Sequence, residues 1–373
     1  RYLASRLFSL RSDAVTPAHA LSDGIDYVPT SRPVLFGHHF ASITGLSPML
    51  GPAIAVIWGW LPAMLWVVLG AILVGCVHDF GALTVSVRAR GMSIGVVAEK
   101  IMGARAKSLL HALIFFGVSL AMGVFAYVVA VLFSPKMYPQ SAVPSAVILV
   151  LALIIGWLVQ RRGLPLGRLV SAAFVVVLFI VLFSDRFPVR WESVSGWIWV
   201  LLAYAFLAAV LPVWSLLQPR DFLNSLLLYM GLALTYLGFF VLRPEFAAPP
   251  FAPSPVGAPS MFPFVFIVIA CGAASGFHSL VASGTTSKQL NRETDARLIG
   301  YGGMLGESLL GLVAVLACTA GFASREAWAG HYASWSDAQD LPSKMSAFIE
   351  GCTRFVSQLG VPDEAARTLI AVV

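Results

Sequence analysis

Long apolar runs alternate with short polar loops from residue 34 to residue 323. A helix that spans a membrane needs about 20 mostly apolar residues, and the ends of these runs coincide with Pro and Gly residues, which interrupt helices. The predicted spans are residues 34–58, 61–87, 108–133, 143–159, 169–184, 196–217, 222–242, 262–283 and 298–323, with a tenth that begins near residue 366. The pattern predicts an all-α polytopic membrane protein with about ten transmembrane helices.

The composition supports this fold class. Hydrophobic residues make up 58% and charged residues 11% of the 373 residues, and the mean hydropathy is +0.85, whereas about a quarter of the residues of a soluble domain are charged. The net charge of +6 does not indicate nucleic-acid binding, because Lys and Arg lie in short loops and not on one basic face. We expect one transmembrane domain at residues 34–373, surrounded by membrane lipid.

The distribution of Lys and Arg indicates the orientation of the predicted spans. If the spans alternate in direction from a cytoplasmic N-terminus, 16 of the 24 Lys and Arg residues lie on the inner side and 8 on the outer side, which includes a long loop at 324–365. Cytoplasmic loops of membrane proteins carry an excess of these residues. We therefore expect residues 1–33 to form a cytoplasmic segment of a multi-pass protein in a bacterial inner membrane.

The first predicted span contains residues that a plain lipid-facing helix avoids. Pro48 and Pro52 remove backbone donors and Gly45 loosens the helix, so the span is predicted to unwind between residues 44 and 52. Non-helical backbone at membrane depth is tolerated where it is buried in protein or lines a polar cavity, which makes the break a candidate binding site; a kinked helix without a ligand is the alternative. The candidate substrate-binding residues are His38, His39, Ser42, Thr44, Gly45, Ser47 and Gly51.

The eighth predicted span carries a second polar cluster, between Ala270 and Thr286. At about 100° per residue, several of its polar side chains fall on one helical face, which we expect to face the first span. Hydrogen bonds that only join neighbouring helices are the alternative role for its serines. The candidates are Ser275, His278 and Ser279 for substrate binding, and Ser283, Thr285 and Thr286 for ion coupling.

Two acidic residues fall within predicted spans. Asp79 lies deep in the second span, and Glu307 follows a run of glycines in the ninth. A carboxylate inside a membrane is costly and often marks a proton or ion path, so both are candidate coupling residues, with Glu307 preferred. The alternatives are an ion pair of Asp79 with Arg88 or Arg90, and a structural hydrogen bond from a protonated Glu307 to a hydroxyl such as that of Ser308.

The sixth predicted span is interrupted at Leu211-Pro212 and closed by the sequence from Gln218 to Asp221. Pro212 and Trp214 are further candidates for substrate binding. Because the first and sixth spans enter from opposite sides and both contain a break, they suggest an inverted repeat of five plus five spans. The first repeat would cover residues 34–184 and the second residues 196–373, incomplete at its C-terminal end.

The sequence contains none of the common catalytic or metal-binding motifs. There is no HExxH or GxSxG motif, and the four cysteines show no CxxC spacing, so we interpret the cysteines as small apolar packing residues. His38 and His39 are adjacent and cannot both face one point on a regular helix. We expect no enzymatic activity, no cofactor and no metal site.

Several segments, in order from about residue 20 to residue 310, resemble the carbon starvation protein A family. The matching segments are Gly24-Ile-Asp-Tyr-Val-Pro-Thr30, Val34-Leu-Phe-Gly-His-His-Phe-Ala41, Gly51-Pro52, His78-Asp79-Phe80, Ala209-Val-Leu-Pro-Val-Trp214, Pro219-Arg-Asp221, Phe262-Pro-Phe264, Ala270-Cys-Gly-Ala-Ala-Ser-Gly-Phe-His-Ser279, Ser283-Gly-Thr-Thr286 and Ile299-Gly-Tyr-Gly-Gly-Met304.

This resemblance implies an inner-membrane carrier that takes up peptides or pyruvate when carbon runs short, driven by protons. It also implies the five-plus-five inverted repeat of the amino acid, polyamine and organocation carriers, with further spans before Arg1 and after Val373. Many family members have Gln at the position of His78, which argues against an essential role for that histidine.

We expect the substrate to bind near the middle of the membrane, between the broken first and sixth spans, with the eighth span as a wall. Backbone N–H groups near Gly45 to Gly51 would meet a substrate carboxylate, because a helix N-terminus attracts anions. A starvation-response channel or sensor is the alternative function.

Overall fold

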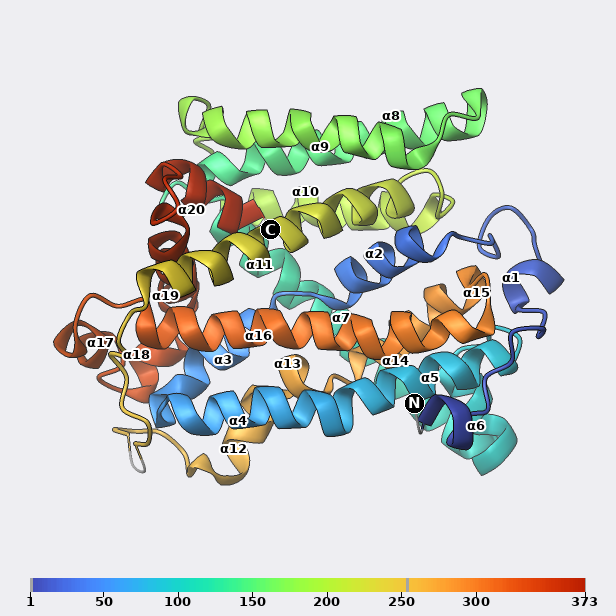
Figure 1. Ribbon diagram of the computed structural model, residues 1–373, viewed down its shortest axis with the longest axis horizontal. Helices are drawn as coiled ribbons and strands as arrows, with labels where there is room; N and C mark the ends of the chain where they lie inside the picture. The colour runs from blue at the N-terminus through green and yellow to red at the C-terminus, as the bar shows by residue number, and fades with distance from the viewer. Residues whose placement is uncertain (1–2, 253–254, 373) are drawn as a thin grey trace.

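Helices form all the regular structure in residues 3–252 and 255–372, the part of the chain that the computed structural model describes (Figure 1). These residues contain no β-sheet, and Thr30 and Leu290 form an isolated parallel bridge. The first half contains α1 (Pro17–Ala20), α2 (Arg32–Ile43), α3 (Ser47–Ala55), α4 (Trp60–Gly70), α5 (Cys76–Arg88), α6 (Ile94–Met102), α7 (Ala104–Leu132), α8 (Ala142–Arg162) and α9 (Leu166–Phe183). The second half contains α10 (Val194–Val210), α11 (Leu217–Leu242), α12 (Met261–Val268), α13 (Ala270–Ala274), α14 (Phe277–Val281), α15 (Ser287–Gln289), α16 (Gly302–Ala320), α17 (Arg325–His331), α18 (Trp335–Gln339), α19 (Leu341–Ser357) and α20 (Asp363–Val372).

The prediction of a polytopic all-α membrane protein is confirmed. Among the described residues, six helices are long and apolar enough to cross a membrane, and the bent pair α2 and α3 makes a seventh if it is one span. The six are Trp60–Arg88, Ala104–Leu132, Pro139–Arg162, Leu166–Arg186, Leu217–Leu242 and Glu293–Ala320. Ten spans and an inverted repeat stay a prediction, which a superposition of residues 34–184 on residues 196–372 tests.

The first span breaks as predicted, but over a shorter stretch. α2 ends at Ile43 and α3 begins at Ser47, with a bend of 47° between the two helices. The expectation that non-helical backbone continues to residue 52 is wrong, because Ser47, Pro48 and Gly51 all lie in α3. Pro48 occupies the first turn of that helix, where no intrahelical N–H bond is needed.

The eighth predicted span is a second broken segment, and the sixth is interrupted at Leu211-Pro212 as predicted. Residues 261–289 divide into α12, α13, α14 and α15, with breaks at Ile269 and at Ser275, whose backbone is extended. The sixth predicted span ends at Val210, because Leu211 precedes a proline and takes an extended conformation. The sequence from Gln218 to Asp221 does not close that span; it forms the start of α11.

The stretch predicted as a loop at 324–365 contains three helices and the start of a fourth. Of these, α19 packs against α3, α11 and α16, and it buries Met345, Phe348, Cys352 and Phe355. These residues recur at helical spacing on one face, as in any amphipathic helix. A search for continuous apolar runs of membrane-spanning length overlooks such a helix.

Small residues allow α3, α13 and α16 to cross at close range. A Cβ atom added to Gly272 of α13 would lie 3.7 Å from the Cα atoms of both Gly311 and Pro48. A Cβ atom on Gly51 would collide with the backbone carbonyl oxygen of Val268. Such close approach of helix backbones is typical of small residues in membrane proteins.

We expect Gly51→Ala to destabilise the protein by about 1–3 kcal/mol, because the new methyl group would collide with the backbone of Val268, which cannot rotate away as a side chain can. Gly117→Ala is the matched control, since Gly117 is an exposed glycine of α7 with open space around it. That change removes a helical glycine and should be neutral or slightly stabilising. Thermal unfolding in detergent would measure both; an unchanged midpoint for Gly51→Ala would contradict the packing described.

Candidate functional site

Two buried acids and a histidine from three distant segments meet in the interior. Asp79 lies on α5, His278 on α14 and Glu307 on α16, and all three side chains are 0% exposed. Each of these segments adjoins a π-helical turn, at Ala71–Gly75, Ala282–Thr286 and Arg297–Tyr301 respectively. Such turns widen a helix locally and are frequent at functional sites.

The imidazole of His278 lies between the two carboxylates. Its Nδ1 is 2.6 Å from Oδ2 of Asp79, and its Nε2 is 2.7 Å from Oε2 of Glu307. The second contact has the distance of an ion pair but not the angles of a hydrogen bond, since neither Nε2 nor Oε2 has a hydrogen-bond partner among the described residues. Oδ1 of Asp79 lies 2.9 Å from Nδ1 of the half-exposed His78. We call Asp79, His278 and Glu307 the acid–imidazole cluster.

Cys271 of α13 also contacts this cluster. Its Sγ lies 3.4 Å from Oε1 of Glu307 and 3.4 Å from Oγ of Ser275. The interpretation of Cys271 as an apolar packing residue is therefore wrong, because its thiol donates to a buried carboxylate. It differs in this from Cys318, which lies in the hydrophobic core.

The side chains of Cys271, His278 and Glu307 are of the types that bind zinc, and their ligand atoms lie within 4.8 Å of one another. However, the 2.7 Å between Nε2 of His278 and Oε2 of Glu307 is shorter than the roughly 3.3 Å that separates two ligands of a tetrahedral zinc ion. As arranged here, the three groups fit a direct contact between an imidazole and a carboxylate better than they fit a metal ion.

The earlier alternatives for the two acids do not hold. Asp79 contacts His78 and His278, whereas the Nε atom of Arg88 lies 2.6 Å from Oε1 of Glu293. The hydroxyl of Ser308 donates to the backbone carbonyl of Val67 and not to Glu307.

A second buried network joins α2 to α11. Nδ1 of His38 lies 2.8 Å from Oδ2 of Asp221, and the hydroxyl of Ser42 donates to the same oxygen at 3.0 Å. The guanidinium of Arg220 donates to Oδ1 of Asp221, at 2.7 Å from Nε, and to the hydroxyl of Tyr204 at 2.5 Å. This arginine–aspartate network neutralises the charge of Asp221 and fixes α2 against α11.

Glutamine side chains extend this network toward the isolated β-bridge. Nε2 of His38 lies 3.3 Å from the amide of Gln289, and Gln218 donates to both Gln289 and Thr30, at 2.6 and 2.8 Å. The backbone N–H of Thr30 in turn donates to the carbonyl of Gln289. These bonds tie the start of α2 to the end of the broken segment.

The two adjacent histidines face different partners. His38 contacts Asp221, whereas Nδ1 of His39 lies 2.8 Å from the hydroxyl of Thr286. The Nε2 atom of His39 is buried and has no hydrogen-bond partner within residues 3–252 and 255–372. The expectation that the pair cannot face one point is confirmed.

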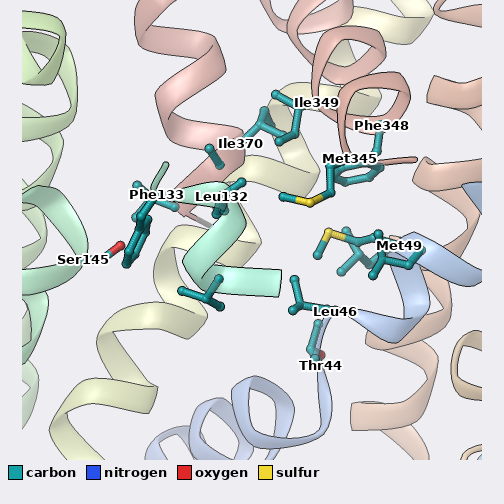
Figure 2. Close-up of a pocket in the computed structure, with 16 residues that line it drawn as sticks. Thr44, Leu46, Met49, Leu132, Phe133, Ser145, Met345, Phe348, Ile349 and Ile370 are labelled. Atoms are coloured by element: carbon teal, nitrogen blue, oxygen red, sulfur yellow. The ribbon is translucent and has the colours of Figure 1, made fainter. Parts of the chain in front are cut away.

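A cavity of about 250 Å³ opens beside the break between α2 and α3 (Figure 2). Thr44, Gly45 and Leu46 of the break line it, and the buried hydroxyl of Thr44 has no hydrogen-bond partner in the part of the chain that the structure describes. The other walls come from α3, α7, α8, α16, α19 and α20 and are almost entirely apolar. Leu310 of α16 lies in the wall three residues after Glu307, so one turn of helix separates the cavity from the acid–imidazole cluster.

The remaining candidate residues lie outside this cavity. Ser47 is in the first turn of α3, and Gly51 packs against α12. Pro212 and Trp214 lie in the connection between α10 and α11. Ser279 donates to the carbonyl of Gly276, the hydroxyl of Ser283 accepts from the N–H of Ile94, and Thr285 lies in the π-helical turn with Thr286.

Sequence reasoning missed the arginine–aspartate network. Arg220 and Asp221 stand side by side after a proline, and we interpreted them as polar residues that end a span. The available signal was an unusual pair of opposite charges immediately before an apolar run. Gln289 carried no signal, because an amide in a polar stretch is common.

Three comparisons place the chain among known proteins. The profile of the family described as carbon starvation protein CstA matches residues 1–358. The peptide transporter CstA of Mycobacterium tuberculosis H37Rv is 39% identical over 332 residues, which cover 85% of this chain and 43% of that protein. The pyruvate/proton symporter BtsT of Escherichia coli K12 is 37% identical over 336 residues, which cover 85% of this chain and 46% of that protein.

The peptide transporter CstA of Escherichia coli K12 is likewise 37% identical, over 330 residues that cover 84% of this chain and 46% of that protein. The chain thus spans about half the length of the curated relatives it matches. No solved structure matches it.

We expect His278→Gln to lower the stability by about 3–5 kcal/mol, because it leaves two buried carboxylates without the imidazole between them. His111→Gln is the control, since His111 is exposed on α7. The thermal midpoint of the purified protein should fall by several degrees for His278→Gln and stay unchanged for His111→Gln. Equal midpoints would show that His278 does not hold the two acids in place.

Proposed function

Because the chain belongs to the carbon starvation protein CstA family, whose members are transporters and not enzymes, we propose that it is a secondary active transporter that imports peptides or pyruvate by proton symport. The observation that carries the proposal is a buried acid–imidazole cluster one helical turn from a cavity at a helix break. A carrier needs a binding site in the membrane interior and a titratable group that responds to it. This chain offers both in neighbouring positions.

The cavity beside Thr44 and Gly45 is the proposed substrate site. The break leaves the N-terminus of α3 next to the cavity, where free backbone N–H groups and the helix dipole attract a carboxylate. The unpaired hydroxyl of Thr44 adds a hydrogen-bonding group. A carboxylate is common to pyruvate and to the C-terminus of a peptide, and the apolar walls suit the side chains of a peptide.

The acid–imidazole cluster is the proposed proton-coupling site. All three side chains are buried, so a proton reaches Glu307 either through the half-exposed His78 that contacts Asp79 or when the surrounding helices move. The breaks at 44–46 and at 275–276 flank the cluster and the cavity, and they are where such motion can occur without breaking a continuous helix. Protonation of Glu307 would weaken its attraction to His278. The charged and the protonated states of Glu307 would therefore favour two different arrangements of α14 relative to α16.

The membrane setting follows from the same assignment. We place the protein in a bacterial inner membrane with a cytoplasmic N-terminus, as the distribution of Lys and Arg predicts. The two broken segments, α2 with α3 and α12 to α14, lie against each other, as discontinuous helices do at the substrate site of many carriers. The inverted repeat of residues 34–184 and 196–373 is part of the same proposal. A channel or sensor has no need to couple a proton to its substrate, which provides the test.

We expect Glu307→Gln to abolish uphill uptake in proteoliposomes while substrate exchange continues. Glutamine keeps the shape of the side chain but cannot titrate, and exchange requires no net proton movement. Glu192→Gln is the control, because Glu192 is exposed and lies in the connection before α10. Accumulation of labelled pyruvate or dipeptide in response to a pH gradient by Glu307→Gln would assign the coupling to another group. Wild-type protein that only equilibrates the substrate would be a channel.

We expect Gly45→Leu to raise KM for uptake at least tenfold, because the side chain would occupy the cavity. Gly117→Leu is the matched control, since it adds the same side chain at an open position of α7. Initial rates of uptake at equal amounts of folded protein would measure both. Unchanged kinetics for Gly45→Leu would place the substrate elsewhere.

A further inference from the structure

A second cavity lies at the end of the molecule opposite α1, where α4 begins and α17 packs (Figure 1). Its volume is about 670 Å³, and Trp60, Phe246 and Trp328 form aromatic walls. Glu245 and Arg325 line the same space. We call this space the end groove. It shares no lining residue with the cavity beside the helix break.

The end groove presents one negative and one positive charge that the protein does not use itself. Glu245 and Arg325 are both exposed, and neither forms a salt bridge within the described residues. In contrast, Arg367 of α20 engages two carboxylates, Glu350 and Glu364. Unpaired opposite charges on one aromatic groove are available to a ligand that carries both an ammonium and a carboxylate group.

Trp328 forms a largely buried part of the wall of the groove. Its side chain is only 8% exposed and packs in the hydrophobic core, so it contributes an apolar edge to the groove. Trp60 and Phe246 stack with their ring centroids 4.8 Å apart, and such aromatic faces attract an ammonium group.

The groove is held in shape by backbone hydrogen bonds. The N–H groups of Trp60 and Leu61 donate to the carbonyls of Pro249 and Pro250, at 3.2 and 3.1 Å. On the other side, the N–H of Ala247 donates to the carbonyl of Thr319 at 2.8 Å. A groove fixed in this way loses little conformational freedom when a ligand binds.

We propose that the end groove captures a zwitterionic ligand, a short peptide with free amino and carboxyl termini, before it enters the cavity beside the helix break. Glu245 and the aromatic faces hold the ammonium group, and Arg325 holds the carboxylate. With a cytoplasmic N-terminus the groove faces the outside, so this inference rests on the transport function proposed above. Pyruvate lacks an amine and gains nothing from Glu245, which makes the groove a selectivity site for peptides.

The test compares three ligands with three variants. We expect Glu245→Gln to raise KM for alanylalanine about tenfold while KM for N-acetyl-alanylalanine and for pyruvate, which lack the ammonium group, stays unchanged. Arg325→Gln should raise KM for both peptides. Glu326→Gln is the matched control, because Glu326 is the next residue of α17 but does not line the groove.

Binding of alanylalanine to the purified protein, followed by tryptophan fluorescence, separates this inference from the transport function. Quenching that Glu245→Gln weakens would support the groove even if no substrate is transported. The inference is overturned if Glu245→Gln behaves like Glu326→Gln with alanylalanine, or if it weakens pyruvate and the N-acetylated peptide equally. Transport of every ligand with unchanged KM in both groove variants would leave the proposed function intact and remove the groove from it.

Discussion

The structure depends on one histidine held between two carboxylates in the buried interior. His278 touches Asp79 on one side and Glu307 on the other, and each of the three residues comes from a different part of the chain. Removing two charges from water costs several kcal/mol per ion unless they are well paired, so α5, α14 and α16 can pack only when these side chains meet. The packing is therefore sensitive to charge, because any change of charge on Glu307 alters the contact that holds α14 to α16.

The helix breaks allow the segments around the acid–imidazole cluster to move, whereas the glycine contacts hold these segments together. The breaks at 44–46 and 275–276 leave short helices that can tilt, whereas Gly272 and Gly311 bring α13 and α16 together without intervening side chains. Helices whose backbones touch can slide past each other only over very small distances before atoms collide. Movement in this region is therefore expected at the breaks, with the short helices as rigid pieces.

The long apolar runs allowed most of the spans to be predicted from the sequence, because hydrophobicity over some twenty residues is a strong signal. The signal failed where structure depends on contacts between segments. Pro48 was expected to unwind the chain, but in the first turn of α3 its missing N–H costs nothing. The polar residues of the broken segment were found, whereas the thiol of Cys271 was not, since only the position of Glu307 gives it an acceptor. Asp221 was missed because its partner His38 lies on a different helix.

The adjacency of His38 and His39 restricts how α2 can move. Consecutive residues project about 100° apart around a helix, and here each imidazole is bonded to a different helical segment, one through Asp221 and one through Thr286. Rolling α2 about its own axis in either direction would carry both imidazoles off their partners at once. The histidine pair therefore fixes the rotation of α2 about its own axis.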